Sequence, residues 1–284
     1  MDRSFEERYF SGREVYGEDL DPAAVARWYR EEEEGYYAIT QARSAYEYAD
    51  HALNEFYAYR FLRGRRFDCC LAVGCARGDD VAPLAGQVGR FLAIEPVREW
   101  WSDSIAGTPA RFLKPRTGDL PVESEAADLA VCLGVLHHIP NAGHVIGEVA
   151  RVLRPGGLFV LREPIQTLGD WRGPRRGLTR NERGFPLSWL DRRLAEAGFR
   201  PLRRTLCRFP LIPRVARLLG LRTPYNRRWL VAADRLASAA TAWNLHYHRD
   251  TLLKKLAPGA VFYLLERAAA PAEGAPRSVD PRQR

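Results

Sequence analysis

Long apolar runs are missing from this sequence. Nowhere do 18 consecutive apolar residues occur, so no segment is typical of a membrane-spanning helix. The first residues, Met-Asp-Arg-Ser-Phe-Glu-Glu, are acidic and do not form the apolar stretch of a secretion signal. We therefore expect a cytoplasmic protein with no membrane partner.

Cysteine is scarce, and the five cysteines do not follow a metal-binding spacing. Four of them fall in stretches that are typical of core strands, which favours reduced, buried thiols. His246 and His248 lie close together, but no cysteine and only a distant acid accompany them. The sequence therefore predicts no metal site. The cysteines are Cys69, Cys70, Cys75, Cys132 and Cys207.

Lysine occurs at only three positions, among 43 basic residues in total, which indicates a compositional bias towards arginine. The net charge is +8, yet the first 60 residues contain 14 acids and 7 bases. Since no separate RNA-binding motif or basic, aromatic-interleaved stripe is present, we do not expect nucleic acid as the partner. With 284 residues and 46% hydrophobic residues, the chain fits one large α/β domain with helical additions.

From about residue 68, apolar strand candidates alternate with helical stretches. This alternation predicts a doubly wound, mostly parallel sheet with helices on both faces. Ligands bind such sheets at the carboxyl ends of the strands. The strand candidates are 68–73, 90–95, 111–114, 127–133 and 157–162, and the helical stretches lie near 79–87, 97–104 and 142–153.

An N-terminal helical cap over residues 1–65 is expected to precede the sheet. Asp21-Pro22 is a typical helix start, and the acidic run Glu31 to Glu34 is interpreted as a solvated face. A second amphipathic helix is predicted over about 40–63, with Gly64 as its end. These helices can fold over the ligand cleft as a lid.

The main domain is predicted to span residues 66–267. An arginine-rich loop at 164–186 is expected to overhang the cleft, and it is followed by a helix at 187–197 and a strand at 200–207. A helical insertion at 208–258 precedes the last strand at 260–266, and the tail at 268–284 is expected to be disordered.

The turn that ends the first strand carries small residues at every second place: Gly74, Ala76 and Gly78. A backbone without bulky side chains allows a flat, charged ligand to lie against it. Later strands also end in polar groups, first at Glu95 and then at Asp119. The fourth ends on the histidine pair 137 and 138.

These strand ends resemble those of the class I S-adenosylmethionine-dependent methyltransferases over about residues 66–163, and Arg151-Val-Leu-Arg-Pro-Gly-Gly157 completes the pattern. The resemblance implies a Rossmann-like, seven-stranded, largely parallel sheet with 260–266 as its one antiparallel strand. It also implies S-adenosylmethionine as the cofactor. A nicotinamide-binding turn differs, because two residues normally separate its last two glycines and only Arg77 does so here.

The resemblance also implies site roles. Gly74, Cys75, Ala76 and Gly78 would pass beside the methionine part of the cofactor, and Glu95 would hold the ribose hydroxyls. Asp119 would meet the adenine amino group, with Leu120 and Pro96 flanking the ring, while Leu133 and Gly134 would line the space under the sulfonium.

Two positions depart from the family pattern. Ala72 stands where many members carry an acid that helps to hold the methionine end, and Ala76 replaces the middle glycine. Asp79 or Asp80 is a candidate to compensate for the missing acid.

The predicted reaction is methyl transfer to a small-molecule or sugar-containing acceptor, most simply at a hydroxyl oxygen. An unactivated hydroxyl requires proton removal, for which His138, or else His137, is the candidate base. Arg172, Arg175 and Arg176, with Tyr37, are candidate substrate contacts, because guanidinium groups suit an anionic acceptor. The alternatives are an RNA methyltransferase and an inactive, cofactor-binding scaffold; the sequence gives no oligomeric state.

Overall fold

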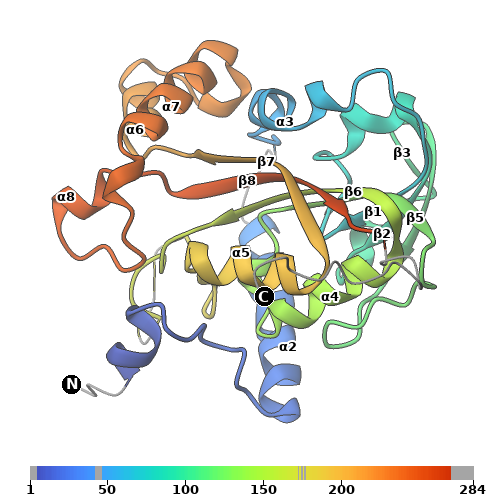
Figure 1. Ribbon diagram of the computed structural model, residues 1–284, viewed down its shortest axis with the longest axis horizontal. Coiled ribbons are helices and arrows are strands. Elements are labelled where there is room, and N and C mark those ends of the chain that lie inside the picture. Colours follow the sequence, from blue (N-terminus) through green and yellow to red (C-terminus); the bar gives the residue numbers. More distant parts are fainter. Residues whose placement is uncertain (1–4, 42–46, 172, 174, 176, 270–284) are drawn as a thin grey trace, which may run out of the picture.

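The computed structural model describes residues 5–41, 47–171, 173, 175 and 177–269, and its centre is a mixed sheet in the order β3-β4-β2-β1-β5-β6-β8-β7 (Figure 1). The predicted α/β sheet is thereby confirmed, and the predicted core strands lie within a few residues of the observed ones. The strands are β1 (Phe67–Val73), β2 (Val88–Ile94), β3 (Ser104–Ile105), β4 (Thr108–Leu113), β5 (Ala127–Leu133), β6 (Leu153–Pro164), β7 (Phe199–Cys207) and β8 (Ala260–Arg267).

Pairing in the sheet is parallel from β4 to β6, and β8 is antiparallel to both of its neighbours. The last strand is thus antiparallel, as the resemblance implied. The sheet has one strand more than the expected seven, because the two-residue strand β3 forms a hairpin with β4. The strand order reverses between β1 and β5, so a crevice is expected at their carboxyl ends.

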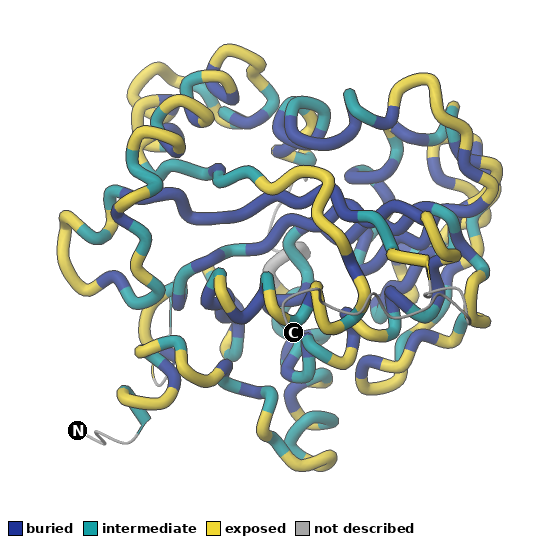
Figure 2. The backbone as a smooth tube through the Cα atoms, viewed as in Figure 1, coloured by how far each residue is buried: buried dark blue, intermediate teal, exposed yellow. Residues whose placement is uncertain are grey.

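Helices cover both faces of the sheet (Figure 1). α4 (Ala142–Val152) and α5 (Leu187–Glu196) pack on one face, while α3 (His51–Tyr57), α6 (Leu211–Leu218) and α7 (Arg228–Ala240) lie on the other. Each face has its own apolar core, and β1 contributes alternate side chains to the two. The central strands β1, β5, β6 and β8 are accordingly buried along most of their length, whereas the edge strand β7 is largely exposed (Figure 2).

α2 (Pro22–Gln41) begins where Asp21-Pro22 predicted, and Oδ1 of Asp21 accepts a hydrogen bond from the Ala24 amide at 2.8 Å. The single helix expected over 40–63 is wrong. Residues 42–46 lie outside the described part, and α3 begins only at His51, because Asp50 has a non-helical backbone with a φ of −126° and a ψ of 17°.

Short 3₁₀ turns, Ala82–Gln87 and Arg98–Trp100, replace the α-helices expected near 79–87 and 97–104. Pro83 and Gly86 disfavour a regular helix in the first segment. The insertion before β8 is helical as predicted. The remaining elements are a π-helical turn at Glu6–Phe10, 3₁₀ turns at Tyr59–Phe61, Leu136–His138, Pro224–Asn226 and Ala242–Asn244, and α8 (Leu252–Lys255).

Among the described residues, no helix is both long and apolar enough to cross a membrane. All five cysteines are free and buried, as predicted.

Candidate active site

The turn after β1 depends on its glycines. Gly74 has a φ of +63°, and a Cβ there would lie 2.4 Å from Cγ1 of Val135. Gly78 has a φ of +87°, and a Cβ would lie 2.7 Å from Cδ1 of Ile105. Ala76 also has a positive φ, +49°, which costs an alanine roughly 1–2 kcal/mol. The turn therefore keeps its left-handed shape at Ala76 despite the missing glycine.

Glu95 links this turn to the end of β2. Its buried carboxylate accepts a hydrogen bond from the Ala76 amide at 2.9 Å and another from the Val97 amide at 3.0 Å. Burial raises the pKa of Glu95 to about 7, although both amide hydrogen bonds act in the opposite direction. Each carboxylate oxygen has a second lone pair, so Glu95 can still accept hydrogen bonds from a ligand.

A cavity of about 570 Å³ lies between this edge of the sheet and α2. Its size is within the range of small-molecule sites. We call it the first cavity. The described residues that line it include Gly74, Glu95, Pro96, Leu120, Gly134, Val135 and His138 from the sheet side, and Tyr29, Glu32, Glu33 and Tyr36 from α2.

Several predicted ligand contacts do not line the first cavity. The Asp119 side chain is 68% exposed and lies 2.7 Å from Nε2 of His144, so the tight turn before Leu120 directs it away from the expected adenine position. Tyr37 packs near Trp100, and its neighbour Tyr36 lines the cavity instead. Among the other predicted cofactor contacts, the described lining omits Cys75, Ala76, Gly78 and Leu133.

A second cavity, of about 450 Å³, shares the lining residue Gly134 with the first. It lies beside the carboxyl end of β6 and the start of the helical insertion. Leu133 faces this second cavity. Its other described lining residues include His137, Arg162, Glu163, Gln166, Glu182, Arg208 and Tyr225.

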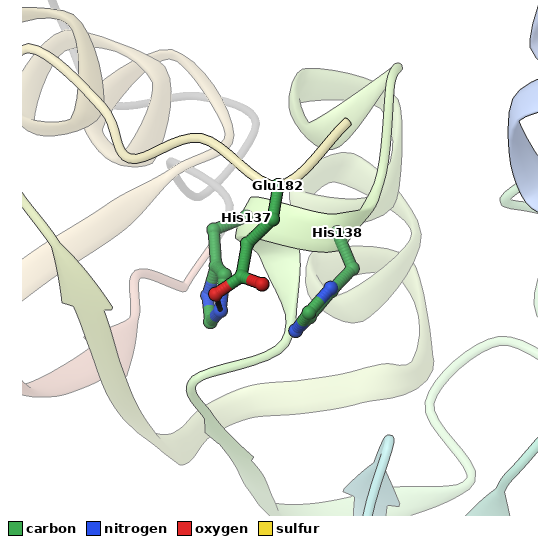
Figure 3. Close-up of side chains that lie close together, drawn as sticks. All are labelled: His137, His138 and Glu182. Carbon is green, nitrogen blue, oxygen red and sulfur yellow. Dashed lines mark ion pairs between the residues drawn. The ribbon is translucent and has the colours of Figure 1, made fainter. Parts of the chain in front are cut away.

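His137 is held between two buried carboxylates, of which Glu182 is drawn beside it in Figure 3. Its Nδ1 lies 2.8 Å from Oε2 of Glu163, and its Nε2 lies 3.4 Å from Oε1 of Glu182. Burial lowers the pKa of His137, but the two carboxylates outweigh that effect and raise it to about 9. Both ring nitrogens of His137 thus face carboxylates, an arrangement that suits the predicted base less well than that of His138.

Glu163 also fixes the backbone of the histidine turn. Its Oε1 accepts hydrogen bonds from the amides of Val135 and Leu136, at 2.9 and 2.8 Å. The same carboxylate thus holds both the turn and the His137 ring.

His138 faces the first cavity and binds α2. Its Nδ1 lies 2.9 Å from Oε2 of Glu32 and 3.2 Å from Oγ1 of Thr179. The solvated face expected for the acidic run is wrong at Glu32, which is only 6% exposed. Trp28 strengthens the same contact by donating its indole N–H to the carbonyl of His138 at 2.8 Å.

Arg183 is fully buried below the histidine turn. Its guanidinium donates hydrogen bonds to five backbone carbonyls and so holds them in one arrangement. These carbonyls belong to Tyr16, Leu136, His137, Ile139 and Pro140. The arginine-rich loop therefore supports the site from within.

Arg175 is used in a similar way. Its terminal nitrogens donate to the carbonyls of Leu168, Thr179, Arg180 and Glu182, and not towards the space expected for an anionic acceptor. Arg172 and Arg176, predicted for the same role, lie outside the described residues.

Comparison with known proteins identifies the central part of the chain. A methyltransferase domain model matches residues 71–161. An uncharacterized methyltransferase of Mycobacterium sp. (strain JLS) is 30% identical over 132 residues, which are 46% of this chain and 51% of that protein. Squalene methyltransferase 2 of Botryococcus braunii is 31% identical over 128 residues, which are 42% of this chain and 34% of that protein. The chain thus spans about a third to a half of the length of these relatives.

A solved structure supports the fold. The 1,6-didemethyltoxoflavin-N1-methyltransferase of Burkholderia thailandensis, determined with 1,6-didemethyltoxoflavin and S-adenosylhomocysteine, superposes with a TM-score of 0.53. The match covers 88% of this chain and 92% of that one at 18% sequence identity. Residues 71–161 are thus similar to methyltransferase domains, and the sheet has the Rossmann-like fold of the S-adenosylmethionine-dependent methyltransferases.

Proposed function

We propose that this protein transfers a methyl group from S-adenosylmethionine to a hydroxyl oxygen of a small-molecule or sugar-containing acceptor. The observation that carries the proposal is that Gly134 lines both cavities, because a donor in one and an acceptor in the other would each lie beside this residue. When bound, S-adenosylmethionine supplies a methyl group that its sulfonium has already activated.

The residues of the first cavity fit this cofactor. Glu95 would accept hydrogen bonds from the ribose hydroxyls, since its carboxylate lines the cavity and retains free lone pairs. Pro96, Val97 and Leu120 give an apolar wall for the adenine ring. Gly74 keeps the turn open, because a side chain there would collide with Val135.

Asp80 is our candidate for the acid that Ala72 does not provide at the end of β1. It is buried just after the glycine turn, and its Oδ1 has no hydrogen-bond partner among the described residues. Burial raises the pKa of Asp80 to about 7. An amino group of the ligand that approached Asp80 would supply the missing partner.

The second cavity is proposed as the acceptor site. Its described walls combine an imidazole, two carboxylates and two guanidinium groups with the Tyr225 ring, which suits a polar, oxygen-rich molecule. The named relatives act on squalene and on N1 of a didemethyltoxoflavin, so they supply no common acceptor. The proposal that the methyl group goes to an oxygen therefore rests on the polar residues that line the second cavity.

His138 is the histidine we propose to contact the reacting region. It lines the first cavity, whereas His137 lines the second and is enclosed by Glu163 and Glu182. Glu32 holds the His138 ring in one orientation through Nδ1. α2 meanwhile covers the first cavity, which excludes water from the donor.

The test is incubation with S-adenosylmethionine that carries an isotopically labelled methyl group, together with fractionated small-molecule and RNA extracts. Mass spectrometry should find the label on an oxygen of a small molecule. Glu95→Ala should abolish labelling, and Glu99→Ala, a change at an exposed neighbour, should not. Label on RNA, or cofactor binding without any labelled product, would contradict the proposal and favour an RNA methyltransferase or an inactive scaffold, respectively.

A further inference from the structure

The wall between the two cavities contains a cluster with the composition of a metal site. One ligand atom from each of His137, His138 and Glu182 lies within 4.8 Å of those from the other two. The three side chains converge on one space in Figure 3. His138 lines the first cavity, while His137 and Glu182 line the second.

The separation of two of these atoms matches a shared ion. A tetrahedral divalent cation with bonds of about 2.1 Å to nitrogen and oxygen holds its ligand atoms about 3.4 Å apart. Nε2 of His137 and Oε1 of Glu182 are separated by 3.4 Å. The ligand atom of His138 lies within 4.8 Å of the other two, so a shortening of at most about 1.4 Å would complete a three-ligand set.

Carboxylates outside the cluster orient both imidazoles. Nδ1 of His137 lies 2.8 Å from Glu163, and Nδ1 of His138 lies 2.9 Å from Glu32. Metal-bound histidines typically donate their other ring N–H to such a group, which fixes the tautomer and leaves Nε2 as the ligand. Glu163 and Glu32 come from different elements, so this arrangement occurs twice independently.

The balance of charge agrees with a cation. Glu32, Glu163 and Glu182 place three buried carboxylates around two imidazoles. The guanidinium groups of Arg175 and Arg183 come near, but their hydrogen bonds go to backbone carbonyls. A divalent ion between the imidazoles would compensate the carboxylates directly.

We propose that His137, His138 and Glu182 bind a divalent first-row transition cation, with Zn²⁺ as the ion whose geometry fits best. Three protein ligands leave one position open, which is the arrangement of catalytic rather than structural zinc sites. Metal binding itself does not depend on the proposed function, but its consequence for an acceptor hydroxyl rests on that function. An acceptor hydroxyl in the open position would lose its proton more readily to solvent and be held beside the donor.

The test is metal binding by protein that carries no histidine tag and has been stripped with a chelator. Equilibrium dialysis with Zn²⁺, followed by elemental analysis, should give one ion per chain. Substitution with Co²⁺ should give the visible absorption bands of a low-coordinate nitrogen and oxygen site. His138→Ala and Glu182→Gln should each weaken Zn²⁺ binding at least about 10-fold.

Matched controls are His246→Ala and Glu196→Gln, which change exposed residues outside the site and should leave binding unchanged. His137→Ala is a poorer variant, because it leaves Glu163 buried without its partner; circular dichroism would show whether it folds. Zn²⁺ binding that is absent, or that survives both His138→Ala and Glu182→Gln, would overturn the inference. Intact cofactor binding in the same sample would show that the proposed function stands without it.

Discussion

Oε2 of Glu32 lies 2.9 Å from Nδ1 of His138, although 106 positions separate them in the chain. The contact joins α2 to the 3₁₀ turn that follows β5, and Glu32 also accepts a hydrogen bond from the Asn181 amide at 2.9 Å. A single buried carboxylate therefore connects the covering helix, the histidine turn and the arginine-rich loop.

Replacing that carboxylate should reduce the reaction rate. Glu32→Gln keeps the size of the side chain but removes its charge, so the hydrogen bond that orients His138 becomes weaker. We expect kcat/KM to fall about 10- to 100-fold, as for other residues that orient an active-site histidine. Steady-state kinetics measures this change. Glu34→Gln, at an exposed position of the same helix, is the control, and an equal loss in both variants would refute the specific role of Glu32.

The glycine at the end of β1 should not tolerate a methyl group. In Gly74→Ala the new Cβ would lie 2.4 Å from Val135, and the φ of +63° adds backbone strain. We expect the free energy of unfolding to fall by about 2–4 kcal/mol and cofactor affinity to decrease.

Gly86→Ala is the matched control for Gly74→Ala, because a Cβ at Gly86 meets no atom within 4 Å. Urea unfolding should show little change for it. Adding Val135→Ala to Gly74→Ala should recover the part of the lost stability that comes from the collision with Val135. The part that comes from backbone strain at residue 74 should remain. A Gly74→Ala protein as stable as the control would contradict this reading of the turn.

Glu95 should make stability and cofactor binding depend on pH in opposite directions. Its pKa of about 7 exceeds the 4.5 of an ordinary glutamate, so the folded protein keeps a proton that the unfolded chain releases. The contribution of Glu95 to the free energy of unfolding therefore falls as pH rises from about 4.5 to about 7. Cofactor affinity should rise through pH 7, because the ionised carboxylate accepts hydrogen bonds more strongly.

Urea unfolding across this pH interval measures the first effect, with Glu95→Gln as the comparison. Asp80, whose pKa burial also raises to about 7, contributes in the same direction and remains in that variant. Glu95→Gln should thus reduce the pH dependence without abolishing it. An unchanged slope would show that Glu95 ionises at its ordinary pKa in the folded protein.

Arg183 should be required for stability. In Arg183→Met the carbonyls of Leu136, His137, Ile139 and Pro140 lose a buried donor. At about 1–3 kcal/mol for each unsatisfied group, relaxation included, we expect a total loss of at least about 3 kcal/mol. Thermal unfolding checks this. Arg180→Ala changes a side chain that is 78% exposed, and it should be close to neutral.

The sheet could be predicted from the sequence because each strand is a short apolar run between helical stretches, and β5 has the predicted bounds, Ala127–Leu133. Such apolar runs indicate strands of a parallel sheet, because these strands are buried on both faces. The helix predicted over 40–63 failed because Asp50 forms a buried ion pair with Arg162 at 3.0 Å, a partner that no local pattern reveals.

The site was predictable only where residues follow strands. Gly74, Glu95 and Gly134 lie at strand ends and line the first cavity. Glu32 and Glu182 come from a helix and an irregular loop, and only the folded chain brings them to the histidines. Glu163 directly precedes the end of β6, so attention to that strand end could have found it.

The account depends on the first cavity binding S-adenosylmethionine, and isothermal titration calorimetry with its demethylated product, S-adenosylhomocysteine, tests this most directly. We predict heat of binding with one molecule per chain, lost or weakened at least about 10-fold in Glu95→Ala and retained in Glu99→Ala. No heat from a folded wild-type protein, or equal affinity in Glu95→Ala, would contradict the account.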